Sequence, residues 1–124
     1  MSVAVDGPGF VALQVRDVEA AAAFCERHLG WRRSPSSPPH AVVFDTAPIP
    51  FAVREPFPDV DLADAARPGL GVVLWFRTPD AQRLHDRLVA AGVTILTPMA
   101  ESPFGPMFSF EGPEGYRLTA HGGE

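Results

Sequence analysis

Hydrophobic and polar residues follow two different periods along the chain, and the change between them predicts strands and helices in turn. Residues 10–15 are apolar and rich in β-formers, and Asp17 stands where a helix N-cap is expected. In the next twelve residues (18–29) apolar side chains recur at the i, i+3, i+4, i+7 spacing of a buried stripe, and Gly30 supplies a C-terminal stop. We therefore expect a strand, an N-cap and a helix here.

The same pattern returns about sixty residues later, which predicts an internal repeat. Residues 71–77 predict a strand, Thr78 an N-cap with Pro79 as the first helical residue, and Gly92 the end of the second helix. The aligned pairs are Leu13 with Leu74, Val15 with Phe76 and Ala20 with Ala81.

Each copy continues with apolar runs separated by turn residues, and these predict further strands. The Pro-rich segment 32–40 is expected to be an edge or loop, because proline cannot donate to a strand ladder. We expect a single domain over 1–124, built from module 1 (about 9–55), a linker (about 56–69) and module 2 (about 70–122). The predicted additional strands are 41–46, 49–55, 93–97, 107–111 and 116–121, with a tight turn at 112–115.

Composition and charge restrict the classes of partner. The chain has 124 residues, 46% of them hydrophobic, which is typical of one globular domain. Its net charge is −5 and its ten basic residues are scattered arginines, so nucleic acid is not expected as a partner. A single cysteine, Cys25, and the lack of a signal or membrane-spanning pattern predict a cytoplasmic protein that is not membrane-bound.

The two βαβββ patterns, with VALQVRDVEAAAAFCERHLG and the closing PFGPMFSFEGPEGYRL, resemble the vicinal oxygen chelate superfamily of glyoxalases, extradiol dioxygenases and bleomycin resistance proteins. The resemblance runs from about Phe10 to His121. It implies an α+β fold in which two modules form a curved, mostly antiparallel sheet around a cavity, with helices on the convex side. It also implies a homodimer.

Metal-dependent relatives place His or Gln at the start of the first strand of each module and Glu on the last strand. In this sequence these positions fall on Phe10, Gly71, Thr119 and Ala52. None of these side chains is a competent ligand for a first-row divalent metal. We therefore expect no metal, no cofactor and no catalytic residue. Cys25, His28 and His85 are interpreted as structural residues of the helices, and His121 as either a cavity-rim or a surface residue.

Strand alternation selects the residues that would face the cavity. Phe10, Ala12 and Gln14 should do so in the first strand, and Gly71, Val73 and Trp75 in its repeat, whereas Trp31, Phe51, Phe108 and Phe110 should pack in the core. Trp75 would stack on a ligand or else pack under the linker or at a subunit interface, and Phe104 would cap the site. The residues predicted to bind ligand are Trp75, Phe104, Gln14, Arg54, Met107, Ser109, Arg117 and Thr119. For Arg54 and Arg117 the interpretation as ordinary edge charges is favoured over ligand binding.

The favoured function is metal-independent sequestration of a small aromatic natural product or antibiotic, as in bleomycin resistance proteins. Acidic linker residues could attract a cationic ligand, although a solvated linker is the favoured explanation of these residues, which are Glu55, Asp59, Asp61 and Asp64. Two alternatives remain open. One is a metal-dependent glyoxalase or dioxygenase using Gln14 and His121 as unusual ligands, and the other is an interaction module with a vestigial pocket.

Overall fold

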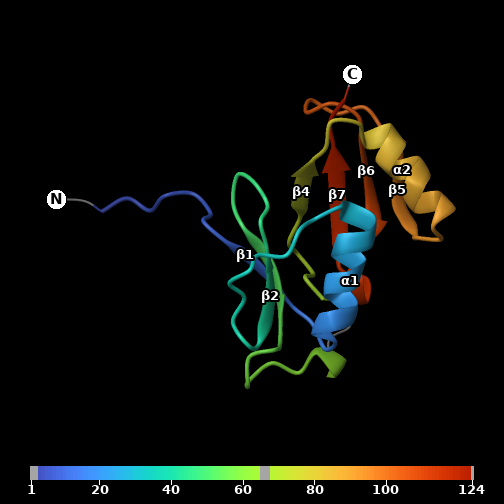
Figure 1. The fold of residues 1–124 in the computed structure, drawn as a ribbon. Coiled ribbons are helices and arrows are strands. Elements are labelled where there is room, and N and C mark those ends of the chain that lie inside the picture. The colour runs from blue at the N-terminus through green and yellow to red at the C-terminus, as the bar shows by residue number, and fades with distance from the viewer. Residues whose placement is uncertain (1–2, 65–67, 124) are drawn as a thin grey trace. The chain divides into compact units, whose positions relative to one another are not determined.

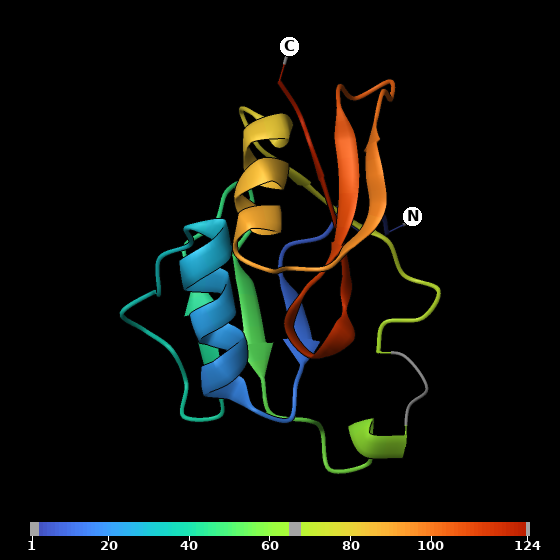
Figure 2. The same ribbon diagram turned by 90° about the vertical axis from the view of Figure 1, so that its right-hand side faces the viewer.

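The computed structural model describes residues 3–64 and 68–123, and the chain divides into two compact units, residues 1–64 and 65–124. Each unit carries one helix beside one sheet, as Figures 1 and 2 show. The boundary falls within the expected linker, of which residues 65–67 lie outside the described part. No helix in the described ranges is long and apolar enough to cross a membrane.

Unit 1 has a three-stranded sheet in the order β1-β3-β2, with β1 parallel and β2 antiparallel to β3. The predicted helix ends are confirmed. Asp17 accepts a hydrogen bond from the backbone N of Ala20 at 3.0 Å, and Gly30 closes the helix with a left-handed φ of 69°. The elements are β1 (Val11–Gln14), α1 (Val18–Leu29), β2 (Ala41–Phe44), β3 (Phe51–Arg54) and a short 3-10 helix, η1 (Leu62–Asp64).

Unit 2 has a four-stranded sheet in the order β4-β7-β6-β5. As in unit 1, the first and last strands along the chain, here β4 and β7, are parallel neighbours. The elements are β4 (Leu74–Arg77), α2 (Ala81–Ala90), β5 (Ile95–Ala100), β6 (Met107–Glu111), η2 (Pro113–Gly115) and β7 (Arg117–His121). The predicted α+β class with two βαβββ-type modules is confirmed, with two sheets that are both mixed in strand direction.

The start of the second module differs from the prediction. The N-cap of α2 is Asp80, whose carboxylate accepts from the backbone N of Arg83 at 3.0 Å, and not Thr78. Thr78 instead donates its backbone N–H to the carbonyl of His121, which keeps it extended. The strand begins at Leu74 rather than at 71, because Gly71 lies in a turn at φ 88°.

These differences change the spacing of the repeat. Val11 and Leu74 begin the two parallel strands, and Asp17 and Asp80 cap the two helices, so both pairs are 63 positions apart. The sequence alignment was two positions short, and Leu13 corresponds to Phe76 rather than to Leu74. The counterpart of Phe10 is therefore Val73, not Gly71.

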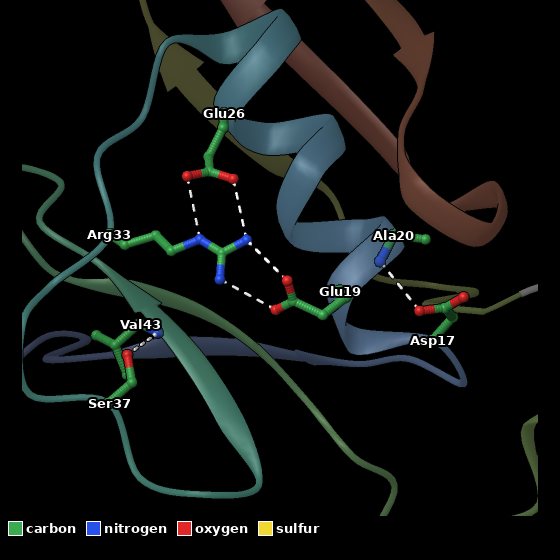
Figure 3. A network of polar contacts seen from close by, with 7 residues as sticks. All are labelled: Asp17, Glu19, Ala20, Glu26, Arg33, Ser37 and Val43. Atoms are coloured by element: carbon green, nitrogen blue, oxygen red, sulfur yellow. Dashed lines mark hydrogen bonds and ion pairs between the residues drawn. The ribbon is translucent and has the colours of Figure 1, made fainter.

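The Pro-rich segment 32–40 is an edge, as predicted. It contributes one isolated bridge, between Arg33 and Phe44, where unit 2 has the full strand β5. Ser34 donates its backbone N–H to the Val43 carbonyl at 2.7 Å, and the Ser37 hydroxyl accepts from the Val43 N–H at 3.0 Å (Figure 3). A side-chain oxygen thus takes the acceptor role that a neighbouring strand would provide.

The core residues expected from the sequence are inside or against the core. Phe51, Phe108 and Phe110 are buried, and the Trp31 ring packs on Phe44 and Phe51 at centroid distances of 5.7 and 4.9 Å. In α1, burial raises the pKa of the Cys25 thiol to about 12, helped by the nearby charge of Glu26. The thiol is therefore neutral at physiological pH and behaves as a small hydrophobic side chain.

Candidate functional site

The sheet of unit 2 presents different chemistry on its two faces. Phe108 belongs to the face covered by α2, because the His85 ring meets it edge-on at 5.2 Å. The residues of opposite parity lie on the other face, where strand pairing aligns Trp75 with Thr119 and Thr119 with Ser109. This face carries five of the eight residues predicted to bind ligand, namely Trp75, Met107, Ser109, Arg117 and Thr119.

Three rings meet at one end of this face. Trp75 lies 5.8 Å from Phe104 and 5.5 Å from His121 between ring centroids, and Phe104 lies 6.2 Å from His121. Despite these contacts, Trp75 is 41% exposed and Phe104 66% exposed. The cluster is therefore an open aromatic surface, and we call these three residues the aromatic cluster.

A tight turn fixes Phe104 in the cluster. The Ser102 hydroxyl donates to the Gly105 carbonyl at 2.6 Å and accepts from the Phe104 backbone N–H at 3.1 Å. The backbones of Ser102 and Gly105 also bond to each other in both directions, and Nδ1 of His121 lies 3.1 Å from the Phe104 carbonyl. Phe104 is thus exposed but anchored by its backbone, which lowers the entropy cost of using it as a contact.

The polar residues beside the cluster are bonded to one another. Ser109 and Thr119 are both 3% exposed, and their hydroxyls are 2.8 Å apart. The Arg117 guanidinium reaches across the sheet to donate to the Thr97 hydroxyl. No buried side-chain nitrogen or oxygen in the described ranges lacks a hydrogen-bond partner. The buried hydroxyls of Ser109 and Thr119 therefore have their hydrogen-bond partners in each other, whereas Arg117 keeps further donors on its guanidinium.

The two predicted residues of unit 1 also lie together. Gln14 and Arg54 are opposite each other in the β1–β3 register. The Gln14 side-chain oxygen accepts from the backbone N–H of Phe57 at 2.8 Å, and the Arg54 guanidinium carbon lies 4.0 Å from the Phe57 ring centroid. Phe57 is 47% exposed. Sequence reasoning missed Phe57, whose one available signal was an aromatic residue between two prolines.

The residues at the metal-ligand positions of the fold do not suit a divalent metal. Phe10 precedes β1 and is 51% exposed, Ala52 and Thr119 are buried in the last strand of each unit, and Val73 replaces Gly71 as the counterpart of Phe10. Hydrocarbon side chains and one hydroxyl offer no imidazole or carboxylate. Across residues 3–64 and 68–123, no three His, Cys, Asp or Glu side chains gather as a metal site.

Arg33 forms a different kind of polar group on unit 1, shown in Figure 3. Its guanidinium bonds both carboxylate oxygens of Glu26 at 3.0 Å and both of Glu19 at 3.0 and 3.2 Å. These two carboxylates raise the pKa of Arg33. Because every contact joins α1 to the edge segment, this arrangement ties that segment to the helix, and we call it the arginine clamp.

An open depression of about 580 Å³ lies beside the start of α1 in unit 1. It contains none of the eight residues predicted to bind ligand, and its charged residues have both signs. The lining residues are Arg16, Asp17, Val18, Glu19, Pro39, His40, Ala41, Val42 and Glu55. Of the acidic linker residues, Asp59 and Asp61 are exposed, and the side chain of Asp64 lies outside the described part.

Comparisons with known proteins agree on the architecture. The profile of the Glyoxalase/Bleomycin resistance protein/Dioxygenase superfamily matches residues 7–119. An antibiotic binding protein, TnmS3 from Streptomyces sp. CB03234, superposes with a TM-score of 0.77 at 21% identity, over 99% of this chain and 100% of its own. Lactoylglutathione lyase from Agrobacterium tumefaciens gives 0.71 at 17% identity, over 96% and 95%.

A glyoxalase-related enzyme from Fulvimarina pelagi gives a TM-score of 0.72 at 24% identity, over 94% of this chain and 87% of its own. No curated protein matches the sequence. At these identities the similar structures establish the fold, and the chemistry has to be argued from the side chains that this chain carries.

Proposed function

Because the chain belongs to the Glyoxalase/Bleomycin resistance protein/Dioxygenase superfamily, we propose that it binds a small aromatic natural product or antibiotic without using a metal. The observation that carries the proposal is the aromatic cluster. Trp75 and Phe104 keep large exposed ring surfaces, and Phe104 is held in place by a bonded turn. Exposed aromatic surface of this kind is costly in water and favours a stacking partner.

Three further points support binding rather than catalysis. The metal positions hold Phe10, Val73, Ala52 and Thr119, which lack the ligands that superfamily enzymes need to activate a substrate. The Cys25 thiol is buried and neutral at physiological pH, so it is no nucleophile. TnmS3, which shares the fold, is an antibiotic binding protein. The ligand would be retained by stacking and by a few polar contacts, without a reaction step.

The first test is a thermal-shift screen against bleomycin, daunorubicin and Mn²⁺, Ni²⁺ and Zn²⁺ salts. A ligand that binds the native state raises Tm, and we expect an aromatic antibiotic to do so. Absence of any shift with the antibiotics, together with stoichiometric binding of one of the metals, would contradict the proposal.

The second test locates the ligand with the two tryptophans. Trp31→Phe leaves Trp75 as the fluorophore, and its emission should be quenched by the ligand found in the screen. Trp75→Phe leaves Trp31, which packs on the core rings of unit 1, and quenching should be lost. In calorimetry Trp75→Ala should weaken binding by about 1 kcal/mol or more. Unchanged affinity in that variant would remove Trp75 from the site.

A further inference from the structure

Arg54 lies on strand β3 of an acidic protein. The chain has 15 acidic and 10 basic residues, and its ion pairs include the doubly paired Arg33. Within residues 3–64 and 68–123, no carboxylate forms an ion pair with Arg54. Its positive charge is therefore not neutralised by a carboxylate within these residues.

The contacts of Arg54 hold its guanidinium by the edge and by one face. Nε donates to the Glu55 carbonyl at 2.9 Å, and the guanidinium carbon lies 4.0 Å from the Phe57 ring centroid. Phe57 is in turn tied to β1 through the Gln14 side chain. Among the described residues, Nε makes the one hydrogen bond of this side chain, so both terminal nitrogens keep donors available in the fixed planar fork that matches a carboxylate or phosphate.

The residue of unit 2 that corresponds to Arg54 makes a similar contact. Ala12 and Ala52 pair as Trp75 and Thr119 do, which places Arg54 at the register position of His121. Arg54 lies against an exposed Phe57, and His121 lies against an exposed Phe104. Both modules therefore end their last strand with a nitrogen-bearing side chain packed on an exposed ring.

We propose that Arg54, supported by Phe57 and Gln14, forms a binding site within unit 1 for an aromatic compound that carries a carboxylate or a phosphate, with the acidic group on the guanidinium and the ring beside Phe57. This inference concerns unit 1 alone and goes beyond the proposed function. It differs from the cationic ligand suggested by the acidic linker, because Arg54 and Phe57 offer a cation and a ring where a cationic ligand would need carboxylates. A protein of net charge −5 gains selectivity for an anion only through such a local group.

The test uses three probes of the same shape, 2-naphthoate, 2-naphthamide and 2-naphthylmethylamine, titrated calorimetrically into the whole protein at pH 7.5. We expect 2-naphthoate to bind about tenfold more tightly than the neutral amide, as for a charge-assisted hydrogen bond. Arg54→Gln should abolish this preference, and Arg54→Lys should retain part of it. Arg27→Gln, an exposed change of equal charge on α1, should leave it intact.

The outcomes separate this inference from the proposed function. Equal affinity for all three probes, or an anion preference that survives Arg54→Gln, overturns the role of Arg54, and quenching of Trp75 by the probes would then still support aromatic binding. Tightest binding of the amine overturns it in favour of a cationic ligand. If none of the probes binds and no antibiotic raises Tm, both proposals are overturned. Circular dichroism of each variant confirms that it is folded.

Discussion

At the centre of the sheet face away from the helix, unit 1 carries Ala12, Ala52 and Val43, whereas the corresponding row in unit 2 is Trp75, Thr119 and Ser109. The strand order and register of the two rows are equivalent, so the backbone is common to both. The difference lies in the side chains. A repeated backbone can thus carry small apolar side chains in one copy and polar and aromatic side chains in the other.

The two modules also differ at the edge of the sheet, and here unit 1 is the one with more side-chain contacts. Unit 2 completes its sheet with β5, an edge strand that contains Pro98 and pairs with β6 through its backbone, and the Arg117 guanidinium also donates to Thr97 on this strand. Unit 1 has one bridge at the same place and adds the arginine clamp to secure the segment. Where backbone hydrogen bonds are few, side-chain pairs fix the edge.

The largest expected effect is on the free energy of unfolding, when a core ring is removed from either unit. Comparing the two variants tests whether both cores are needed for stability. Phe44→Ala in unit 1 and Phe108→Ala in unit 2 each remove a fully buried ring and should lower the free energy of unfolding by about 3–5 kcal/mol. Urea denaturation followed by Trp31 or Trp75 fluorescence measures it, in backgrounds with the other tryptophan changed to Phe. A loss below 1 kcal/mol in either unit would show that its core does not hold the fold.

The next effect comes from the residue that follows the last strand of each module. A Cβ on Gly122 would clash with the Thr78 carbonyl oxygen, and the φ of Gly122 is 130°, so Gly122→Ala should destabilise unit 2 by about 3 kcal/mol. Its counterpart Glu55 is exposed, and Glu55→Ala should change stability by less than about 0.5 kcal/mol. Equal Tm values for the two variants would contradict the difference.

A smaller effect is expected from the arginine clamp. Arg33→Met removes a bidentate partner from both Glu19 and Glu26, and because the three side chains are partly exposed the loss should be about 1 kcal/mol. The loss should shrink in 1 M NaCl because salt screens exposed charges. Thermal unfolding at low and high salt measures this. Arg83→Met on α2 is the matched control, and a salt-independent loss would argue against an ionic clamp.

The smallest effect at neutral pH concerns Cys25. The thiol should resist iodoacetamide at pH 8 in native protein and react after unfolding, as mass spectrometry would show. Because its folded pKa is raised from 9.0 to about 12, its contribution to stability is complete below pH 9 and is lost as the pH rises toward 12. Cys25→Ala should flatten this decline, and rapid labelling of native protein would contradict burial.

Much of the fold could be predicted because it depends on local signals. Asp17, Gly30 and the apolar stripe between them set α1, and alternation separated the core rings from Trp75. The start of α2 could not be read in the same way. Thr78, Pro79 and Asp80 all suit a helix N-terminus, and the hydrogen bond from Thr78 to the distant His121 decides among them.

The candidate site was predicted in part. Alternation assigned Ser109, Thr119 and Trp75 to one face, which strand pairing confirms, while their role in binding stays a prediction. The contact of Phe57 with Arg54 was not foreseen, because it joins the segment after β3 to both β3 and β1 through a side-chain hydrogen bond. The periodic pattern of hydrophobic residues cannot reveal such a contact.

The sequence by itself determined the two modules, the helix in each and their core faces. These follow from periodicity, capping and side-chain chemistry, which act over a few residues. Tertiary structure decided the repeat spacing of 63, the choice of Asp80 as cap, and the grouping of Trp75, Phe104 and His121. Those depend on strand pairing and on contacts between residues far apart in the chain, which local patterns do not encode.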